Sequence, residues 1–437
     1  MSPTIIGIVA IVVMVLVFLT RMPVAYVMAM VGFVGFGIII NFNAAMNLVA
    51  QSYYEMFASY GLTTVPLFIL MGQLAFNSGI SRRLYDAGYK FLGNVRGGLA
   101  IATVSACTAF GAVCGSSAAT AATMATVGLP EMRRFKYADE LAAGSVASGG
   151  GLGMIMPPSV VLIIYGVLTE QSIGRLFMAG ILPAILVTIL FAIAILIWCT
   201  FAPDQGPRGE TFTWKEKIQS IWGLGETLAV FALVMGGLFM GLFTPTEAAA
   251  VGAFGVLLVS VLRRQMTWAG FVDALLETLR TSCMVMVLVA GAHLFGKFLA
   301  VTRIPFDIAT WIGAFDLPGY MIMAAIVGVY FVGGSFMDSL ALVMLTVPVF
   351  FPIVLKLGYD PIWFGIIIVM VTQIGVITPP VGINAYVVFG VGRTLPGGLT
   401  LESIFRGIVP FLLAVVVGIA LMFVFPQIIL YLPNLMY

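Results

Sequence analysis

The sequence carries few charges for its length. Of 437 residues only 9% are Asp, Glu, Lys or Arg, and 61% are hydrophobic. About a quarter of the residues in a soluble domain are charged. A chain with so few polar groups cannot cover a water-exposed surface, so the composition excludes an ordinary soluble domain and predicts that lipid surrounds much of the protein. The net charge of +2 gives no indication of a nucleic-acid partner.

Histidine and cysteine are also scarce. The one histidine, His293, lies in an apolar segment, where a hydrogen bond between helices is its expected role. The four cysteines lie in apolar segments without metal-site spacing, and buried thiols of this kind act as small hydrophobic residues. The chain lacks H-E-x-x-H and the phosphate-binding G-K-[ST], and one histidine does not complete a Ser/His/Asp set. We therefore expect neither an enzyme nor an ATP-driven pump.

Apolar runs suited to spanning helices recur along the whole chain. A helix that crosses a hydrocarbon core of about 30 Å needs about 20 such residues. The clearest runs are Ile5–Leu19, Val24–Ile40, Leu176–Cys199, Leu228–Leu242, Ala248–Leu262, Cys283–Ala300 and Ile408–Phe425. The first run lacks a basic leader and a small-residue cleavage site, so we interpret it as a retained helix. The sequence predicts an all-α polytopic membrane protein.

The basic residues predict its orientation. With both termini outside, sixteen of the twenty Lys and Arg residues fall on the cytoplasmic side, Arg21 among them. This topology requires two segments, 97–130 and 318–356, to be re-entrant hairpins. Each would enter the membrane and leave it again on the same face. Their expected tips are Gly115–Ser116–Ser117 and Gly333–Gly334–Ser335. Irregular backbone at membrane depth is tolerated only against protein or a watery cavity, so two tips predict an internal site.

An internal repeat supports this interpretation. GMIMPPSVVLIIYG (153–166) matches GVITPPVGINAYVVFG (375–390), about 220 positions further on. Each copy follows a hairpin with Gly–Ser and precedes a helix that begins GILP or GIVP. The chain crosses the membrane an odd number of times between the copies, so the repeats are inverted. Inverted repeats with broken helices are typical of secondary transporters.

The double prolines explain how such breaks could bind ions. Proline removes a backbone donor and leaves carbonyl groups free, which suit Na⁺, while half-helix N-termini suit an anion. Two polar features of the sequence have a structural explanation beside, or in place of, a role in binding. Asp338, just beyond the second tip, is either a functional carboxylate or the N-cap of a helix. Thr244–Pro245–Thr246–Glu247 is interpreted as a structural capping box.

Three stretches are too polar to span and are expected to form amphipathic helices at the interface. They are 44–60, 81–97 and 267–282.

The run GSSAATAATMATVGLPEMRRFKYADELAAGSVASGGGLGMIMPPSVVLIIYG (115–166) resembles the large membrane subunit of tripartite ATP-independent periplasmic (TRAP) transporters. GLFTPTEAAAVGA (241–253) and QIGVITPPVGINAYVV (373–388) are similar to it as well. The resemblance covers essentially the full chain. It implies an elevator-type importer of organic acids with Na⁺ in a bacterial inner membrane. In that membrane the outer side, where the basic residues place both termini, is the periplasm. The resemblance also implies a small four-helix membrane subunit and a periplasmic substrate-binding protein as partners.

The resemblance implies at least two Na⁺ sites and one anion site. One Na⁺ site would lie between the first tip and the first break, and another between the second tip and the second break. The residues for the two ions are Gly115, Ser116, Gly150, Met156, Pro157, Gly334, Asp338, Thr378, Pro379 and Gly382. The organic anion would contact Ser117, Ser335 and Asn384.

The expected organisation alternates scaffold and transport segments. It comprises 1–96 (scaffold helices and interfacial arm), 97–175 (first transport half), 176–282 (central scaffold helices, cytoplasmic loop and second arm), 283–317 (scaffold helix and connector), 318–400 (second transport half) and 401–437 (C-terminal helix). Two alternatives stay open. One is proton coupling through Asp338, Glu226, Glu247 or His293, and the other is a facilitative channel. The sequence leaves open whether the substrate is a dicarboxylate, a sialic acid, another sugar acid or a sulfonate.

Overall fold

The fold is built from α-helices and short 3₁₀ turns. The computed structural model describes residues 2–18, 20, 22–222, 224–307, 310, 318–396 and 398–436, and it has no strand within them. Arg21 and most of the expected connector before residue 318 lie outside the described residues.

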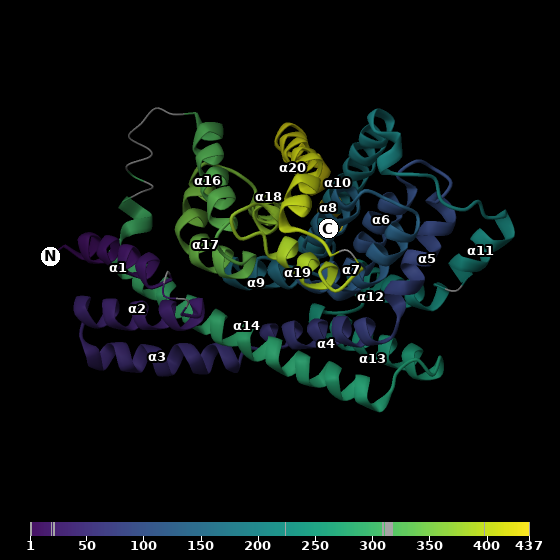
Figure 1. The fold of residues 1–437 in the computed structure, drawn as a ribbon. Helices are drawn as coiled ribbons and strands as arrows, with labels where there is room; N and C mark the ends of the chain where they lie inside the picture. Colours follow the sequence, from purple (N-terminus) through teal and green to yellow (C-terminus); the bar gives the residue numbers. More distant parts are fainter. Residues whose placement is uncertain are drawn as a thin grey trace.

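One group of helices forms a layer, which we call the scaffold layer. It runs along the lower side of Figure 1. It consists of α1 (Pro3–Phe18), α2 (Val24–Ile39), α3 (Phe42–Phe57), α4 (Thr64–Asn77), α12 (Gly225–Phe239), α13 (Pro245–Leu262) and α14 (Trp268–Thr302). Helix α14 packs against α2, α3 and α4, and α13 packs against α4 and α12.

The remaining long helices form a second group above this layer, which we call the hairpin unit (Figure 1). Its first half is α6 (Gly98–Cys114), α7 (Ser117–Arg134), α8 (Asp139–Gly151), α9 (Val160–Thr169) and α10 (Ile173–Phe201). Its second half is α16 (Gly319–Gly334), α17 (Ser339–Lys356), α18 (Pro361–Ile377), α19 (Ile383–Gly392) and α20 (Leu401–Val424). Each half thus contains a hairpin, a broken helix and a long helix, in the order that the sequence repeat predicts.

The two halves are interwoven. Hairpin helix α7 packs against α8 of its own half and against α19 of the other half. Hairpin helix α17 correspondingly packs against α18 and α9. Each hairpin therefore rests on the first part of its own broken helix and on the second part of the other, so neither half is a separate domain.

Local sequence explains where the hairpins turn and where the long helices break. In the first hairpin Gly115 adopts φ +65°, and the Ser116 hydroxyl accepts a hydrogen bond from the Ala119 amide at 3.4 Å as the N-cap of α7. The second turn spans 335–338, because Gly333 and Gly334 still belong to α16. It is therefore displaced toward Asp338 from the predicted tip. The double prolines lie in the non-helical segments 155–159 and 378–382.

Three short α-helices of the described part of the chain lie outside both groups. Helix α5 (Ile80–Leu92) packs against α6 and α7, and α11 (Trp214–Trp222) packs against α5. The chain ends with α21 (Gln427–Leu435), which packs against α10. Single-turn 3₁₀ helices stand at η1 (Gly61–Thr63), η2 (Leu152–Met154) and η3 (Pro203–Gln205).

Helix α14 differs from the prediction. The sequence predicts an interfacial helix at 267–282 before a separate spanning helix, but both belong to one helix of 35 residues. At about 1.5 Å per residue it is about 52 Å long, more than a hydrocarbon core is thick. No Gly or Pro occurs from 271 to 290, so nothing in the sequence ends the helix between its polar and apolar parts.

The role expected for His293 is also corrected. Its Nε2 is buried and has no hydrogen-bond partner among the described residues, and it lies 3.9 Å from a Glu55 carboxylate oxygen on α3. The predicted capping box at α13 is confirmed: Thr244 and Glu247 exchange hydrogen bonds across the first turn, with Pro245 as the first helical residue.

Several helices satisfy the length and hydropathy of a membrane span. Within the described residues five do so singly, and up to seven do so if each of two bent helix pairs is one span. The halves of the broken helices and several hairpin helices are apolar but shorter.

Candidate functional site

The first hairpin tip rests directly on the first break. A Cβ on Gly115 would overlap the carbonyl oxygen of Pro158, and a Cβ on Gly153 would lie 3.0 Å from the carbonyl oxygen of Ser116. Only glycine allows backbone to approach backbone this closely. Two main-chain segments are thus held against each other at Gly115 and Ser116, and the Na⁺ site that the family resemblance implies at this place stays a prediction.

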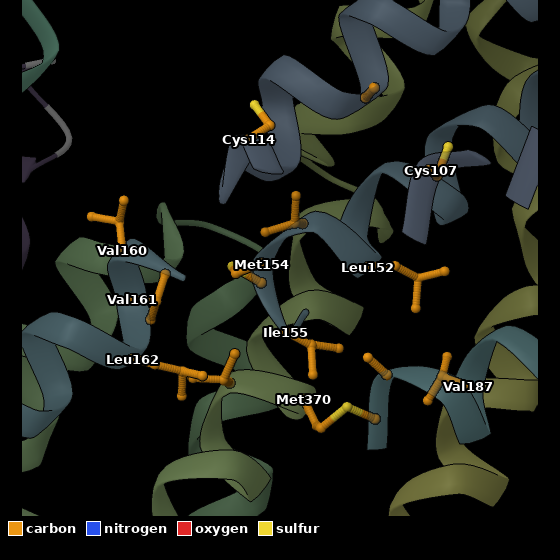
Figure 2. Close-up of a cluster of buried hydrophobic side chains, with 14 of the residues drawn as sticks. Cys107, Cys114, Leu152, Met154, Ile155, Val160, Val161, Leu162, Val187 and Met370 are labelled. Atoms are coloured by element: carbon orange, nitrogen blue, oxygen red, sulfur yellow. The ribbon is translucent and has the colours of Figure 1, made fainter. Parts of the chain in front are cut away.

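Apolar side chains surround the first break. Figure 2 shows Leu152, Met154 and Ile155 among side chains of the neighbouring helices. Those neighbours are Cys107 and Cys114 of α6, Val160, Val161 and Leu162 of α9, Val187 of α10 and Met370 of α18. Pro157 is buried here and Met156 is half-buried. The polar backbone at this break is therefore shielded from water on most sides.

The second hairpin tip contacts the second break in the corresponding way. The amide of Val381 donates a hydrogen bond to the carbonyl oxygen of Ser335 at 3.3 Å. A Cβ on Gly375 would overlap the backbone of Gly334. The Thr378 hydroxyl donates to the carbonyl of Ile374 at 2.6 Å. Unlike the first break, this segment is exposed at 379–381.

Two residues predicted for the ion sites lie in packing positions. A Cβ on Gly150 would overlap Ala121 of α7, so Gly150 allows α7 and α8 to pack closely. Gly382 precedes α19 with φ +53°, and its backbone lies beside the Thr378 carbonyl.

A cavity of about 350 Å³ lies between the two tips and the scaffold layer. Its lining includes Ser117, Asn384 and Asp338 from the hairpin unit, together with Gln73 of α4 and Thr281 of α14. The structure thus brings Ser117 and Asn384 together with Asp338. Ser335 does not line this cavity. It is buried at its own tip, where its hydroxyl donates to the Phe331 carbonyl at 3.1 Å.

The predicted pair Ser117 and Asn384 is linked directly. The Ser117 hydroxyl donates to Asn384 Oδ1 at 3.0 Å, and Asn384 Nδ2 donates to the Ala147 carbonyl at 3.0 Å. Asn384 is fully buried. This amide therefore connects α19 with both α7 and α8 at the edge of the cavity.

Four helices begin at this cavity. Its lining contains the first residues of α7 (Ser117), α9 (Val160), α17 (Ser339) and α19 (Ile383). Helix N-termini expose unpaired N–H groups and carry partial positive charge, which favours a bound anion. Among the residues that the structure describes, no Lys or Arg lines the cavity. The one carboxylate among these lining residues, Asp338, accepts a hydrogen bond from the Leu340 amide at 3.0 Å and caps α17, as one of the two predicted roles requires.

Sequence reasoning missed the scaffold side of the cavity. Gln73 is a polar residue in the apolar run LFILMGQLAF, which was a usable signal. Thr281 had no such signal, because it falls at the polar-to-apolar junction inside α14. Among the described residues no cluster of three or more His, Cys, Asp or Glu side chains could hold a metal ion. An ion at the first tip would therefore depend on hydroxyl and carbonyl oxygens, and an ion at the second tip could add the single carboxylate of Asp338.

Comparison with known proteins agrees with this architecture. Residues 11–428 match the family described as "Tripartite ATP-independent periplasmic transporter, DctM component". The crystal structure of the Alcanivorax borkumensis YdaH transporter is similar with a TM-score of 0.57 and 14% identity, over 89% of this chain and 90% of that one. At that identity the likeness shows the fold alone.

Closer relatives are permease proteins. The C4-dicarboxylate TRAP transporter large permease protein of Pseudomonas aeruginosa is 35% identical, over 89% of this chain and 90% of its own length. The sialic acid TRAP transporter large permease protein of Vibrio cholerae is 32% identical over 91% and 92%. The 2,3-diketo-L-gulonate large permease protein of Escherichia coli is 34% identical over 87% and 88%. These relatives are transporters and not enzymes, which confirms the prediction from the missing catalytic motifs. The chain belongs to the large permease family of tripartite ATP-independent periplasmic transporters.

Proposed function

We propose that this chain is the permease of a Na⁺-coupled importer of a small organic anion. The observation that carries the proposal is the convergence of four helix N-termini on one cavity, which no Lys or Arg of the described part of the chain lines. Such a cavity suits a carboxylate held by N–H groups and hydroxyls. The relatives are named for C4-dicarboxylates, sialic acid and 2,3-diketo-L-gulonate, and each of these compounds carries a carboxylate.

Na⁺ would bind where each tip meets its break. Both contacts bring backbone carbonyl groups and hydroxyls together, and oxygen is the ligand that a hard cation prefers. An ion bound to both segments would hold tip and break together. Because each tip also leads into a helix whose N-terminus faces the cavity, Na⁺ would favour the arrangement that binds the anion. Such differential affinity is what couples two ligands.

Transport would proceed by movement of the hairpin unit past the scaffold layer. The interwoven halves support motion as one body, since each hairpin packs on both broken helices. The scaffold layer meets this body mainly through α4 and α14, which contact α6, α9 and α17. The inverted repeat would then expose the cavity to either side of the membrane in turn, with both termini in the periplasm.

Two partners complete the proposed importer. A small four-helix membrane subunit would enlarge the scaffold layer, and a periplasmic substrate-binding protein would deliver the anion. The family description, which makes the chain one component of a tripartite transporter, supports both.

Uptake by the reconstituted three-component system tests the proposal. Succinate, N-acetylneuraminate and 2,3-diketo-L-gulonate are each offered with and without a Na⁺ gradient. S116A, at the first tip, is expected to raise the Na⁺ concentration for half-maximal uptake about tenfold, the equivalent of about 1.4 kcal/mol. Ser105→Ala, in α6 of the same hairpin, is the matched control and should leave Na⁺ dependence unchanged.

The readouts separate the alternatives. Uptake that a pH gradient drives without Na⁺ would replace Na⁺ coupling with proton coupling. Equilibration of substrate without accumulation would indicate a channel. Equal Na⁺ dependence in S116A and the unmodified protein would remove the first tip from the ion site.

A further inference from the structure

Helix α11 presents an apolar face that nothing in the described chain covers. Trp214, Ile218, Ile221 and Trp222 recur at helical spacing along one side, and the two tryptophans are 74% and 76% exposed. Glu216 and Gln219 lie away from this side, and Lys215 flanks it next to Trp222. No residue of this helix is buried. It is too short to span a bilayer and too apolar on one side to lie in water alone.

The helix is held in place by its other contacts. The Thr213 hydroxyl and amide both donate to the Glu216 carboxylate, at 2.7 and 2.8 Å, which fixes the first turn. The Lys217 ammonium lies 5.8 Å from the ring centre of Phe91 in α5 and 5.1 Å from that of Trp214. These contacts hold α11 on α5, and the apolar side chains of α11 remain exposed.

Residues 202–213, which lead into α11, are tied to the hairpin unit. The Gly97 amide donates to the Gly206 carbonyl at 2.9 Å, and the Gly209 amide donates to the Gly93 carbonyl at 2.8 Å. The Ala138 amide, at the start of α8, donates to the Gln205 carbonyl at 3.0 Å. This segment therefore connects α11 with the beginning of both α6 and α8.

The flanking helices place α11 at the level of a membrane surface. Helix α10 is long and apolar enough to span, and its exposed residues Ile193, Ile197 and Phe201 follow one face to its end. Helix α12 is apolar and begins at Gly225, and it satisfies the length and hydropathy of a span only together with α11, from which it is bent by 51°. The bend turns α11 away from the direction of α12, as expected for a segment that lies along the boundary of the bilayer between the end of α10 and the start of α12. Tryptophan is enriched at that boundary, where its ring is partly in headgroups and partly in hydrocarbon.

We propose that α11 is an interfacial anchor, and that Trp214, Ile218, Ile221 and Trp222 insert into the lipid at the bilayer surface. Glu216 and Gln219 remain in the aqueous headgroup layer, and the Lys215 ammonium reaches it from the edge of the apolar face. The occupant of the apolar face is lipid, because the face continues the exposed apolar exterior of the flanking helices and bears a tryptophan at each end. Through residues 202–213 the anchor holds the base of the first hairpin at a fixed depth. This inference requires only a membrane protein and does not depend on Na⁺ coupling.

Site-directed spin labelling tests the anchor. Ile218→Cys and Gln219→Cys are each made in the full chain with Cys283→Ser, because Cys283 is the exposed one of the four native cysteines. The labelled proteins are studied in phosphatidylcholine nanodiscs with the small membrane subunit co-expressed. Collision rates with oxygen, which partitions into lipid, are compared with those of a water-soluble nickel chelate. The expected ratio of oxygen to nickel collisions exceeds one at 218 and falls below one at 219.

Each other outcome overturns the proposal. Preference for the nickel chelate at both positions would place α11 in water. Protection of position 218 from both reagents would mean that protein covers the face, and the same measurement without the small subunit would show whether that subunit is responsible. Ile221→Cys repeats the measurement if the first variant does not fold. The parent protein with Cys283→Ser alone controls for labelling of the buried cysteines.

Discussion

Asn384 shows how much one buried side chain connects. Its amide accepts a hydrogen bond from Ser117 and donates one to the Ala147 carbonyl, so it joins the first hairpin to both broken helices. The sequence predicts it as a contact of the transported anion. Its full burial and two protein partners give it a structural role beside the cavity, and a bound anion would have to share or displace the Ser117 hydroxyl.

Asn384→Ala is expected to destabilise the protein. Removing the amide leaves the Ala147 carbonyl and the Ser117 hydroxyl without their partner in a buried setting, which costs about 1–3 kcal/mol. Thermal unfolding in detergent measures the effect as a lower Tm. Asn47→Ala, on the exposed side of α3, is the control and should change Tm little. An unchanged Tm for the Asn384 variant would contradict the proposed structural role.

A pair of glycines separates backbone strain from tip packing. Gly115 and Gly79 both adopt positive φ, +65° and +68°, so alanine at either costs about 1 kcal/mol through the backbone alone. Only at Gly115 does the added Cβ also meet another segment, the Pro158 carbonyl. Gly115→Ala should therefore abolish uptake in proteoliposomes, whereas Gly79→Ala should retain most of it. Equal activity in both would mean that contact between tip and break is dispensable.

At the scale of elements, α4 meets the first hairpin through a glycine. A Cβ on Gly72 would lie 2.7 Å from the Cys114 carbonyl oxygen and 3.1 Å from the Cys114 Cα. The scaffold layer and the hairpin unit thus approach each other backbone to backbone at this point. Small residues permit such close approach between membrane helices.

Gly72→Ala should force α4 and α6 apart, because the added methyl group meets the Cys114 backbone and costs about 1 kcal/mol or more of strain. We expect this strain to slow uptake several-fold. Gly236→Ala in α12 is the matched control, since nothing lies within 4 Å of a Cβ there. Initial rates of uptake at equal protein content compare the two. A normal rate for the Gly72 variant would mean that the contact yields without cost.

The order of elements could be predicted, but some boundaries could not. The matching proline pairs and the Gly–Ser turns predicted two hairpins, each followed by a broken helix. The extent of α14 was not predicted, because hydropathy changes at residue 282 while the helix itself has no reason to end there. Hydropathy reports the solvent around a helix, whereas the backbone ends where Gly, Pro or a cap interrupts it.

At the scale of the whole molecule, α16 and α17 of the second hairpin stand at one side and α6 of the first hairpin stands toward the other, with α7 between them beside α19 (Figure 1). The central cavity between their tips is bounded by both. That the two hairpins enter from opposite faces of the membrane stays a prediction from the distribution of basic residues.

Accessibility of single cysteines tests that topology. Lys136→Cys, between α7 and α8, should react with a membrane-impermeant maleimide only from the cytoplasmic side. Lys356→Cys, at the end of α17, should react only from the periplasmic side. Intact cells and inverted vesicles provide the two sides. Labelling of both positions from one side would contradict inverted repeats.

The sequence by itself determined that lipid surrounds the protein, that its elements are helices, and that two halves of the chain carry matching breaks. Low charge requires lipid, and helix breakers at matched positions mark the same turns twice. Only the tertiary structure decided which half-helices share a cavity, because α7 packs on α19 and α17 on α9 across the repeat. It also decided that Asn384 is held by protein partners and that Ser335 lies at its own tip. Contacts between segments more than 150 residues apart depend on how the two halves pack together, and no local pattern in the chain encodes them.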